Sequence, residues 1–65
     1  MNAPTIRCGT KFIHNTWTDT NNAPLRCVVT AVREGRIYWK EATEEKARLW
    51  FFEDEVGQYV REVIA

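Results

Sequence analysis

The stretch LRCVVTAVREGRIYWK, residues 25–40, decides the fold of this chain. Apolar and polar residues alternate over residues 25–33, and β-branched residues are common there, a pattern typical of a strand with one buried face. Glu34-Gly35 is a turn signal, and residues 36–40 alternate again. The stretch therefore predicts an antiparallel hairpin at the centre of a small sheet.

Two registers are open to this hairpin. A two-residue loop pairs Arg33 with Arg36, whereas a three-residue loop with a left-handed Gly35 pairs Val32 with Arg36. The three-residue loop separates apolar from polar side chains better, and a slip by one residue would exchange the two faces. We therefore predict the three-residue loop. Its buried face carries Leu25, Cys27, Val29, Ala31, Ile37 and Trp39, and its outer face carries Arg26, Thr30, Arg36, Tyr38 and Lys40.

The chain on either side of the hairpin predicts two more strands. Residues 6–13 alternate loosely, and residues 47–52 form an apolar, aromatic run of strand length. Residues 15–23 are rich in Asn, Thr and Asp, whose side chains favour turns, so we expect a polar loop there. Residues 1–5 are expected to be a flexible lead-in.

A helix is predicted for residues 53–64. Apolar residues recur there at helical spacing, and three acidic residues fall in the first turn, where the helix dipole favours negative charge. Gly57 weakens this interpretation. Two alternatives stay open: a single helical turn followed by a last strand over residues 59–64, and one long helix from about Thr43.

The chain has 65 residues, enough for one small domain and too few for a large enclosed active site. It contains no Ser, and its three glycines are isolated, so the sequence offers neither a serine nucleophile nor a glycine-rich phosphate loop. We therefore expect no enzymatic activity, no catalytic residues and no cofactor.

Charge is balanced overall but divided along the chain. Nine basic and nine acidic residues cancel, which argues against a free-standing nucleic-acid-binding domain. Residues 1–40 hold six basic and two acidic residues, a net charge of +4, and residues 41–65 hold three basic and seven acidic residues, a net charge of −4. No stretch is apolar enough to span a membrane, and none suggests a secretory signal, so a cytoplasmic location is expected.

The order of these features resembles small SH3-like barrels found in short proteins of bacteriophages and other mobile elements. The resemblance covers about residues 9–63 and rests on a pattern of turns and strands. It implies a mostly β fold, an antiparallel barrel of four to five short strands with a short C-terminal helix. Many such proteins have no assigned activity, so the resemblance implies little about function. The segments that carry it are 9–12, the loop around Trp17, 27–32, Gly35, 37–39, 50–52, Glu55 and 59–60.

Exposed aromatic residues point first to docking on a protein partner. Trp17 lies in a polar loop, where it is either an anchor for a partner or a lid over the core. Phe51 and Phe52 are adjacent, so in a strand they face opposite sides and one of them needs a cover. Trp39 and Trp50 are expected in the core. The predicted anchors are Trp17, Tyr38, and Phe51 or Phe52.

The basic outer face of the hairpin gives the alternative function. Cations around an exposed ring hold single-stranded nucleic acid, with phosphates on the cations and bases on the ring. The same face is equally compatible with simple solvation or with pairing to the acidic half. A third possibility is that the oppositely charged halves join copies of the chain into a homo-oligomer. The residues of the nucleic-acid alternative are Arg26, Arg33, Arg36, Tyr38 and Lys40.

The two cysteines leave three interpretations open. Cys8 and Cys27 are buried thiols in a reducing compartment, or they form a cross-strand disulfide, or they bind a metal together with His14. The paired close spacing of structural zinc sites is absent, so we predict no metal site.

Overall fold

The central hairpin forms as the sequence predicts, and the rest of the sheet is built around it. In the computed structural model, which describes residues 6–43 and 49–64, β2 (Pro24–Arg33) pairs antiparallel with β3 (Arg36–Glu41). β1 (Lys11–Thr18) joins the other side of β2, and β4 (Leu49–Phe52) joins β3. β5 (Val60–Ile64) pairs with β1, giving the order β4-β3-β2-β1-β5.

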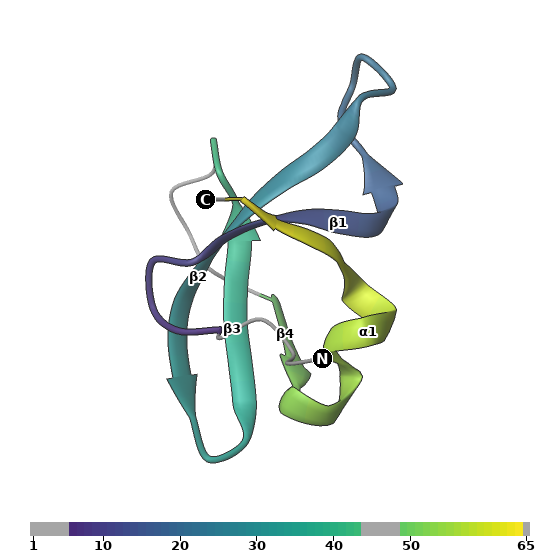
Figure 1. The fold of residues 1–65 in the computed structure, drawn as a ribbon. Coiled ribbons are helices and arrows are strands. Elements are labelled where there is room, and N and C mark those ends of the chain that lie inside the picture. The colour runs from purple at the N-terminus through teal and green to yellow at the C-terminus, as the bar shows by residue number, and fades with distance from the viewer. Residues whose placement is uncertain (1–5, 44–48, 65) are drawn as a thin grey trace.

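The sheet is open and has two edges. Figure 1 shows β2 running from the top of the view to the lower left, and the strand order places β3 and β4 on one side of it and β1 and β5 on the other. The 3₁₀ turn η1 (Glu53–Glu55) and the helix α1 (Val56–Tyr59) carry the chain from edge strand β4 to edge strand β5. The protein is therefore mostly β, with one short helix near its C-terminus.

The predicted three-residue hairpin loop is wrong. Arg33 pairs directly with Arg36, and the turn consists of Glu34 and Gly35 alone. Both turn residues have positive φ, 52° and 75°, as a tight turn between two twisted strands requires. A two-residue turn of this kind matches the twist of the two strands. This preference outweighs the better separation of apolar from polar side chains that a three-residue loop would give.

A bulge in β2 restores the buried face that the shorter loop would otherwise disrupt. The register shifts between Val29 and Ala31, so Val29 lies opposite Trp39, and Ala31 lies opposite Tyr38. As a result Val29 and Val32 both pack on the core, whereas Ala31 lies opposite outward-facing Tyr38. The prediction that Ala31 faces the core is therefore wrong, and Val32 takes that role.

The first strand lies later in the chain than predicted. β1 occupies residues 11–18, so the expected loop over 15–23 is strand in its first half. The remaining turn is closed by Asp19, whose Oδ1 accepts hydrogen bonds from the amides of Asn21 and Ala23 at 2.8 and 3.0 Å. The lead-in expected at residues 1–5, and residues 47 and 48 of the strand expected at 47–52, lie outside the described residues.

The predicted helix over residues 53–64 is correct only for its first half. The last five residues before Ala65 form β5, as the alternative of a helical turn and a strand proposed. Val56, Tyr59 and Val60 pack against the core from the helical turn and from the start of β5. Helical spacing of apolar residues is satisfied here by one turn, after which the chain pairs with β1.

The core lies on the inner face of the curved sheet. It brings together rings and aliphatic side chains from four strands, with α1 covering one end. Phe12 is central, with edge-on ring contacts to Trp39 at 5.7 Å and to Phe51 at 6.2 Å between centroids. Its buried members are Phe12, Leu25, Cys27, Val29, Ile37, Trp39 and Phe51. Among the helices of the described residues, none is long and apolar enough to cross a membrane.

Candidate docking surface

Strand alternation places three aromatic rings on the outer face of β3 and β4. Tyr38 lies opposite Trp50, and Arg36 lies opposite Phe52. Because neighbours in a strand face opposite sides, Phe51 points inward, where it is 1% exposed. Trp50 and Phe52 on either side of it are 44% and 45% exposed. Two large apolar side chains thus stand side by side in water.

These rings contact one another and carry cations. Trp50 meets Phe52 edge to face at 4.9 Å and Tyr38 in a tilted arrangement at 6.5 Å. The Arg36 guanidinium lies 4.8 Å from the centroid of Trp50, and that of Arg33 lies 5.9 Å from the centroid of Tyr38. We call this set of five residues, Arg33, Arg36, Tyr38, Trp50 and Phe52, the outer patch.

One sequence prediction for this strand is wrong, because Trp50, expected in the core, is exposed. Of the two phenylalanines predicted as alternative anchors, Phe51 is a core residue and offers no surface for docking. One rule could have found both: if Phe51 faces inward beside Ile37, both of its neighbours must face outward. The prediction that one ring of the Phe51-Phe52 pair is exposed is confirmed, and that ring is Phe52.

The predicted basic face is divided between two places. Arg33, Arg36 and Tyr38 lie together, and Lys40 follows Tyr38 by two residues on the same strand, which puts it on the same face. Arg26 lies seven residues before Arg33 on β2, about 23 Å along an extended strand. Lys40 pairs with Val28, two residues from Arg26, so Lys40 and Arg26 lie toward the same end of the hairpin. Arg26 also lines a hollow with Ile13, Asp19, Ala23, Pro24, Arg61 and Glu62.

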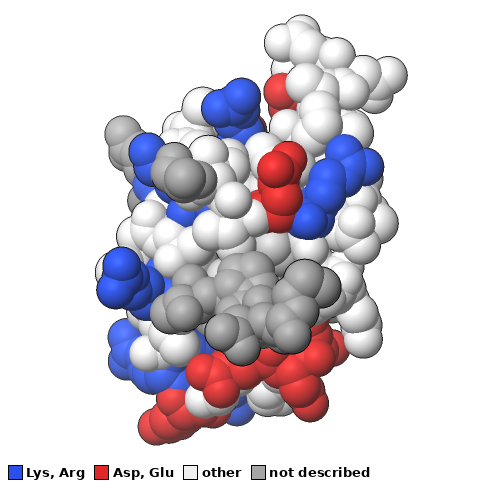
Figure 2. Space-filling model, viewed as in Figure 1, with Lys and Arg blue, Asp and Glu red and all other residues white. Residues whose placement is uncertain are grey.

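Acidic residues follow the outer patch along the chain, at the end of β4 beside the hairpin turn. Glu53 follows Phe52 directly, and its amide donates to the Gly35 carbonyl at 2.9 Å, which ties the start of η1 to the hairpin turn. Figure 2 shows acidic side chains along the lower rim of the molecule and basic ones along the adjoining flank. On this face, acidic and basic side chains therefore lie beside one another.

Trp17 is half exposed at the far end of β1 and lies outside the outer patch. Its ring stacks on His14, 4.7 Å between centroids and nearly parallel at 9°, and it also contacts Trp39 at 5.7 Å. Trp17 therefore covers part of the core with one side and presents the rest to solvent. The interpretation of Trp17 as a lid describes the side that packs on His14 and Trp39, and its role as an anchor stays a prediction for the exposed side.

His14 is buried, 2% exposed, and holds the backbone of its own strand. Its Nδ1 accepts hydrogen bonds from the amides of Thr16 at 3.1 Å and Trp17 at 3.0 Å. Nδ1 therefore carries no proton, and the proton of the neutral ring sits on Nε2. Burial lowers the pKa of His14, so the ring stays neutral, and Nε2 has no hydrogen-bond partner among the described residues.

The cysteines are separate thiols. Cys27 is in the core, where burial and then the charge of Glu41 raise its pKa to about 12. Cys8 is exposed, so the interpretation of both cysteines as buried thiols holds for Cys27 alone, and the Cys8 Sγ donates to the Thr30 carbonyl at 3.2 Å. Among the described residues no three His, Cys, Asp or Glu side chains are grouped for a metal ion, so Cys8, His14 and Cys27 do not form such a site.

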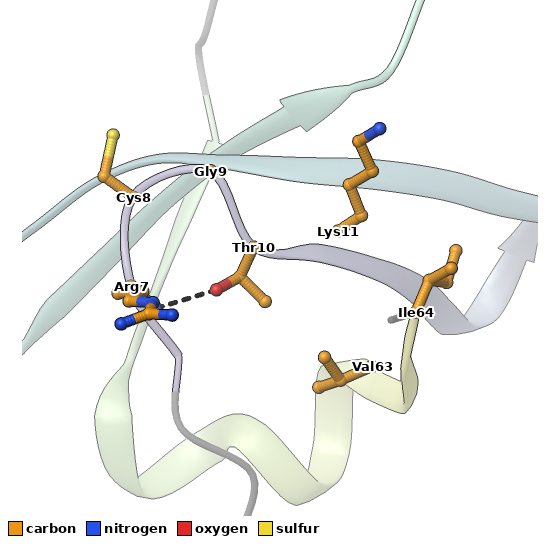
Figure 3. A pocket seen from close by; sticks show the side chains of 7 residues that line it. All are labelled: Arg7, Cys8, Gly9, Thr10, Lys11, Val63 and Ile64. Atoms are coloured by element: carbon orange, nitrogen blue, oxygen red, sulfur yellow. Dashed lines mark hydrogen bonds between the residues drawn. The ribbon is translucent and has the colours of Figure 1, made fainter.

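A hollow of about 640 Å³ lies between the 7–11 segment and the end of β5. In Figure 3 the charged ends of Arg7 and Lys11 lie on opposite sides of it, above an apolar floor of Val63 and Ile64. Since its two cations do not converge on one point, this hollow lacks the convergent polar groups of a small-molecule site.

Comparisons with family models, curated proteins and solved structures find no match to this chain.

Proposed function

We propose that the chain is a non-enzymatic binding module that docks on a protein partner through the outer patch. One observation carries the proposal: Trp50 and Phe52, each nearly half exposed, stand together with two arginine guanidinium groups on the neighbouring rings. Exposed apolar surface is costly, at roughly 25 cal/mol per Å². Trp, Tyr and Arg are also the residues that most often dominate the energetics of protein interfaces.

The electrostatic surroundings favour a protein over a nucleic acid. The Arg36 guanidinium covers Trp50, whereas a stacking platform for bases needs an open ring face. Glu53, Asp54 and Glu55 follow Phe52 directly and would repel a phosphate backbone that crossed the patch. A protein partner with charges of both signs around an apolar centre fits the arginines and the acidic residues of this surface.

A nucleic-acid-binding role is the second candidate, and the two exposed cations Arg33 and Arg36, paired on neighbouring strands, favour it. Phosphates of a nucleic acid bind to cations gathered in this way. This role would use Arg33, Arg36 and Tyr38 near the turn of the hairpin, whereas Arg26 and Lys40 lie toward its other end.

The first role is tested by panning a library of random displayed peptides against the protein, which is immobilised at low density. The matched control is the double variant Trp50→Ala/Phe52→Ala. We expect apolar sequences to be enriched on the wild type alone, with affinities at least about tenfold higher than for the control. Equal enrichment on both proteins, or none on either, would contradict docking through the outer patch.

A short oligodeoxythymidylate and a DNA duplex test the second role by fluorescence anisotropy. Binding that depends on Arg33 and Arg36, and that weakens steeply as salt rises, would replace the protein partner with nucleic acid. We expect no such binding.

We further infer that in solution the sheet closes into an SH3-like barrel of the kind found in short bacteriophage and mobile-element proteins. The strand order, with a 3₁₀ turn between the fourth and fifth strands, supports this inference. Nuclear Overhauser contacts in solution between the backbones of β4 and β5 would indicate closure, and their absence would leave an open sheet.

A further inference from the structure

One face of the Trp17 indole ring is turned to solvent. The centroid of this ring lies 4.7 Å from that of His14 and 5.7 Å from that of Trp39, and the centroids of His14 and Trp39 lie 5.3 Å apart. The three rings therefore form a nearly equilateral triangle, so neither neighbour lies across the far face of Trp17. Since the side chain is half exposed, the far face carries much of that exposure.

A hollow of about 560 Å³ adjoins Trp17, and Leu25 adds apolar surface to its lining. The volume lies in the range of ligand-binding hollows, about 300–1,000 Å³. Glu41, at the end of β3, also lines it. Glu41 follows Arg36 by five residues, roughly 17 Å along an extended strand. The hollow is therefore separate from the arginines of the outer patch.

Asp19 and Glu41 are the charged residues among the described residues that line this hollow, and both are partly buried. Oδ1 of Asp19 accepts the amides of Asn21 and Ala23. Oε1 of Glu41 accepts the Thr43 hydroxyl at 3.1 Å. These bonds use one oxygen of each carboxylate, which leaves the other oxygen for the N–H groups of a ligand. The lining thus offers two carboxylates and no lysine or arginine, so it favours a cation.

We propose that this hollow binds the guanidinium group of an arginine side chain from a protein partner, which stacks on the open face of Trp17 and donates to Asp19 and Glu41. A guanidinium is planar and weakly hydrated, so it stacks on an indole ring while its edge donates to carboxylates. A metal ion fits less well, because no three His, Cys, Asp or Glu side chains of the described residues are grouped for one. The inference goes beyond the proposed function, since it assigns a second contact remote from the outer patch.

The groups that would hold the cation are fixed before it arrives. The Trp17 amide donates to Nδ1 of buried His14 at 3.0 Å, and the two stacked rings are within 9° of parallel. The bonds of the Asp19 carboxylate to the amides of its own turn restrain that group in the same way. Binding therefore orders fewer side chains, which lowers the entropic cost of a small contact.

The test is a titration that follows the indole N–H signals by nuclear magnetic resonance. The probe is Nα-acetyl-argininamide, and its matched control is Nα-acetyl-citrullinamide, which has nearly the same shape and no charge. We expect the arginine probe to shift the Trp17 signal saturably, and the citrulline probe to bind at least about tenfold more weakly. The signal that is missing from Trp17→Leu is that of Trp17. A shift of the Trp50 signal instead would place the probe on the outer patch and overturn the inference.

Two double variants remove the same number of charges from different places. Asp19→Asn/Glu41→Gln keeps an oxygen that accepts the hydrogen bonds of the turn, and should weaken binding of the arginine probe at least about fivefold. Glu53→Gln/Asp54→Asn is the matched control, because the Glu53 amide bonds to the Gly35 carbonyl at the other end of β3. It should bind the probe as the wild type does. Equal affinity of the two double variants would overturn the inference, with circular dichroism as the check that both are folded.

The remaining outcomes separate this inference from the proposed function. Trp50→Ala/Phe52→Ala is expected to bind the arginine probe normally, which would show that the hollow acts without the outer patch. If calcium chloride shifts the Trp17 signal and displaces the probe at a lower concentration than the probe itself needs, the hollow is a metal site and the inference is overturned. A wild type without a saturable Trp17 shift also overturns it, whereas the peptide experiment alone decides docking through the outer patch.

Discussion

At the scale of single residues, His14 shows how one buried side chain fixes a local backbone path. The registers of β1 with β2 and with β5 both become irregular after Ile13, where regular strand pairing breaks down. The imidazole Nδ1 accepts the amides of Thr16 and Trp17 there. The neutral ring is thus required by the backbone, and no sequence pattern around a lone histidine reveals such a role.

The stability of the protein is expected to fall in mild acid because of His14. In the unfolded chain this residue has its ordinary pKa of about 6.5, whereas burial lowers the pKa in the folded state. Below about pH 6.5 the unfolded chain therefore binds a proton that the folded chain does not, and the free energy of unfolding decreases by up to about 1.4 kcal/mol per pH unit. Urea unfolding between about pH 7.5 and 5.5 measures this decrease.

His14 is the only histidine, so His14→Phe is the natural control. The variant should lose the pH dependence in this range. It should also be less stable at neutral pH by about 1–3 kcal/mol, because two amides lose their acceptor. A wild type whose stability does not change over this range would show that His14 titrates normally in the fold.

Gly35 is the second residue whose conformation matters. Its φ of +75° lies in the left-handed region, so Gly35→Ala is expected to destabilise the protein by about 1 kcal/mol, although no atom crowds the added Cβ. Gly57→Ala is the matched control, since Gly57 lies in α1 without a positive φ, and it should be neutral or stabilising by up to about 1 kcal/mol. Equal destabilisation by the two changes would argue against the tight turn at Glu34 and Gly35. Thermal unfolding compares them.

At the scale of elements, β4 shows how one short strand serves the core and the surface together. Its pairing with β3 places Phe51 against Phe12 and Tyr59, and leaves Trp50 and Phe52 outside. The sequence predicts this division only in part. Adjacent phenylalanines must face opposite sides, but which one faces the core depends on a register that four residues do not specify.

Neighbouring substitutions in β4 should have opposite effects. Phe51→Ala is expected to cost about 3–5 kcal/mol of stability, because it leaves a cavity in the core. Phe52→Ala should cost less than about 1 kcal/mol and should weaken docking. Chemical denaturation measures both. If Phe51→Ala does not fold, Phe51→Leu, with an expected loss of up to about 1.5 kcal/mol, keeps the comparison. A larger loss for the Phe52 variant would reverse our assignment of the two faces.

Other elements show the same limit of sequence reasoning. Leu25, Cys27, Val29, Ile37 and Trp39 are all buried, as the alternation predicts. The loop length was wrong because a bulge near Thr30 lets a two-residue turn keep those residues inside, and a bulge has no clear sequence signal. The predicted helix over residues 53–64 is too long because Val56, Tyr59 and Val60 satisfy the helical spacing within one turn. Pairing with β1 then makes residues 60–64 a strand.

At the scale of the whole molecule, a small core implies modest stability. For 65 residues we expect a free energy of unfolding of roughly 3–10 kcal/mol. The two cysteines offer a way to measure it without denaturant, because Cys8 is exposed and Cys27 is buried with a raised pKa.

Thiol labelling should therefore occur in two phases. With a thiol reagent such as an aromatic disulfide, Cys8 is expected to react promptly, and Cys27 to react at least about a hundredfold more slowly, through the unfolded state. Cys8→Ala leaves only the slow phase and Cys27→Ala only the fast one, which assigns them. Prompt reaction of both thiols would mean that the core opens far more often than its packing implies.

The backbone amide of Phe52 affects how readily the edge strand β4 can pair with another chain. It donates to Oε1 of Glu55 at 3.0 Å, so a carboxylate from the next turn occupies a backbone donor of the edge strand β4. Edge strands with unoccupied backbone groups template the addition of further chains, and adjacent aromatic rings strengthen fibrils that grow in this way. The Glu55 carboxylate thus removes one donor through which a further chain could add to this edge.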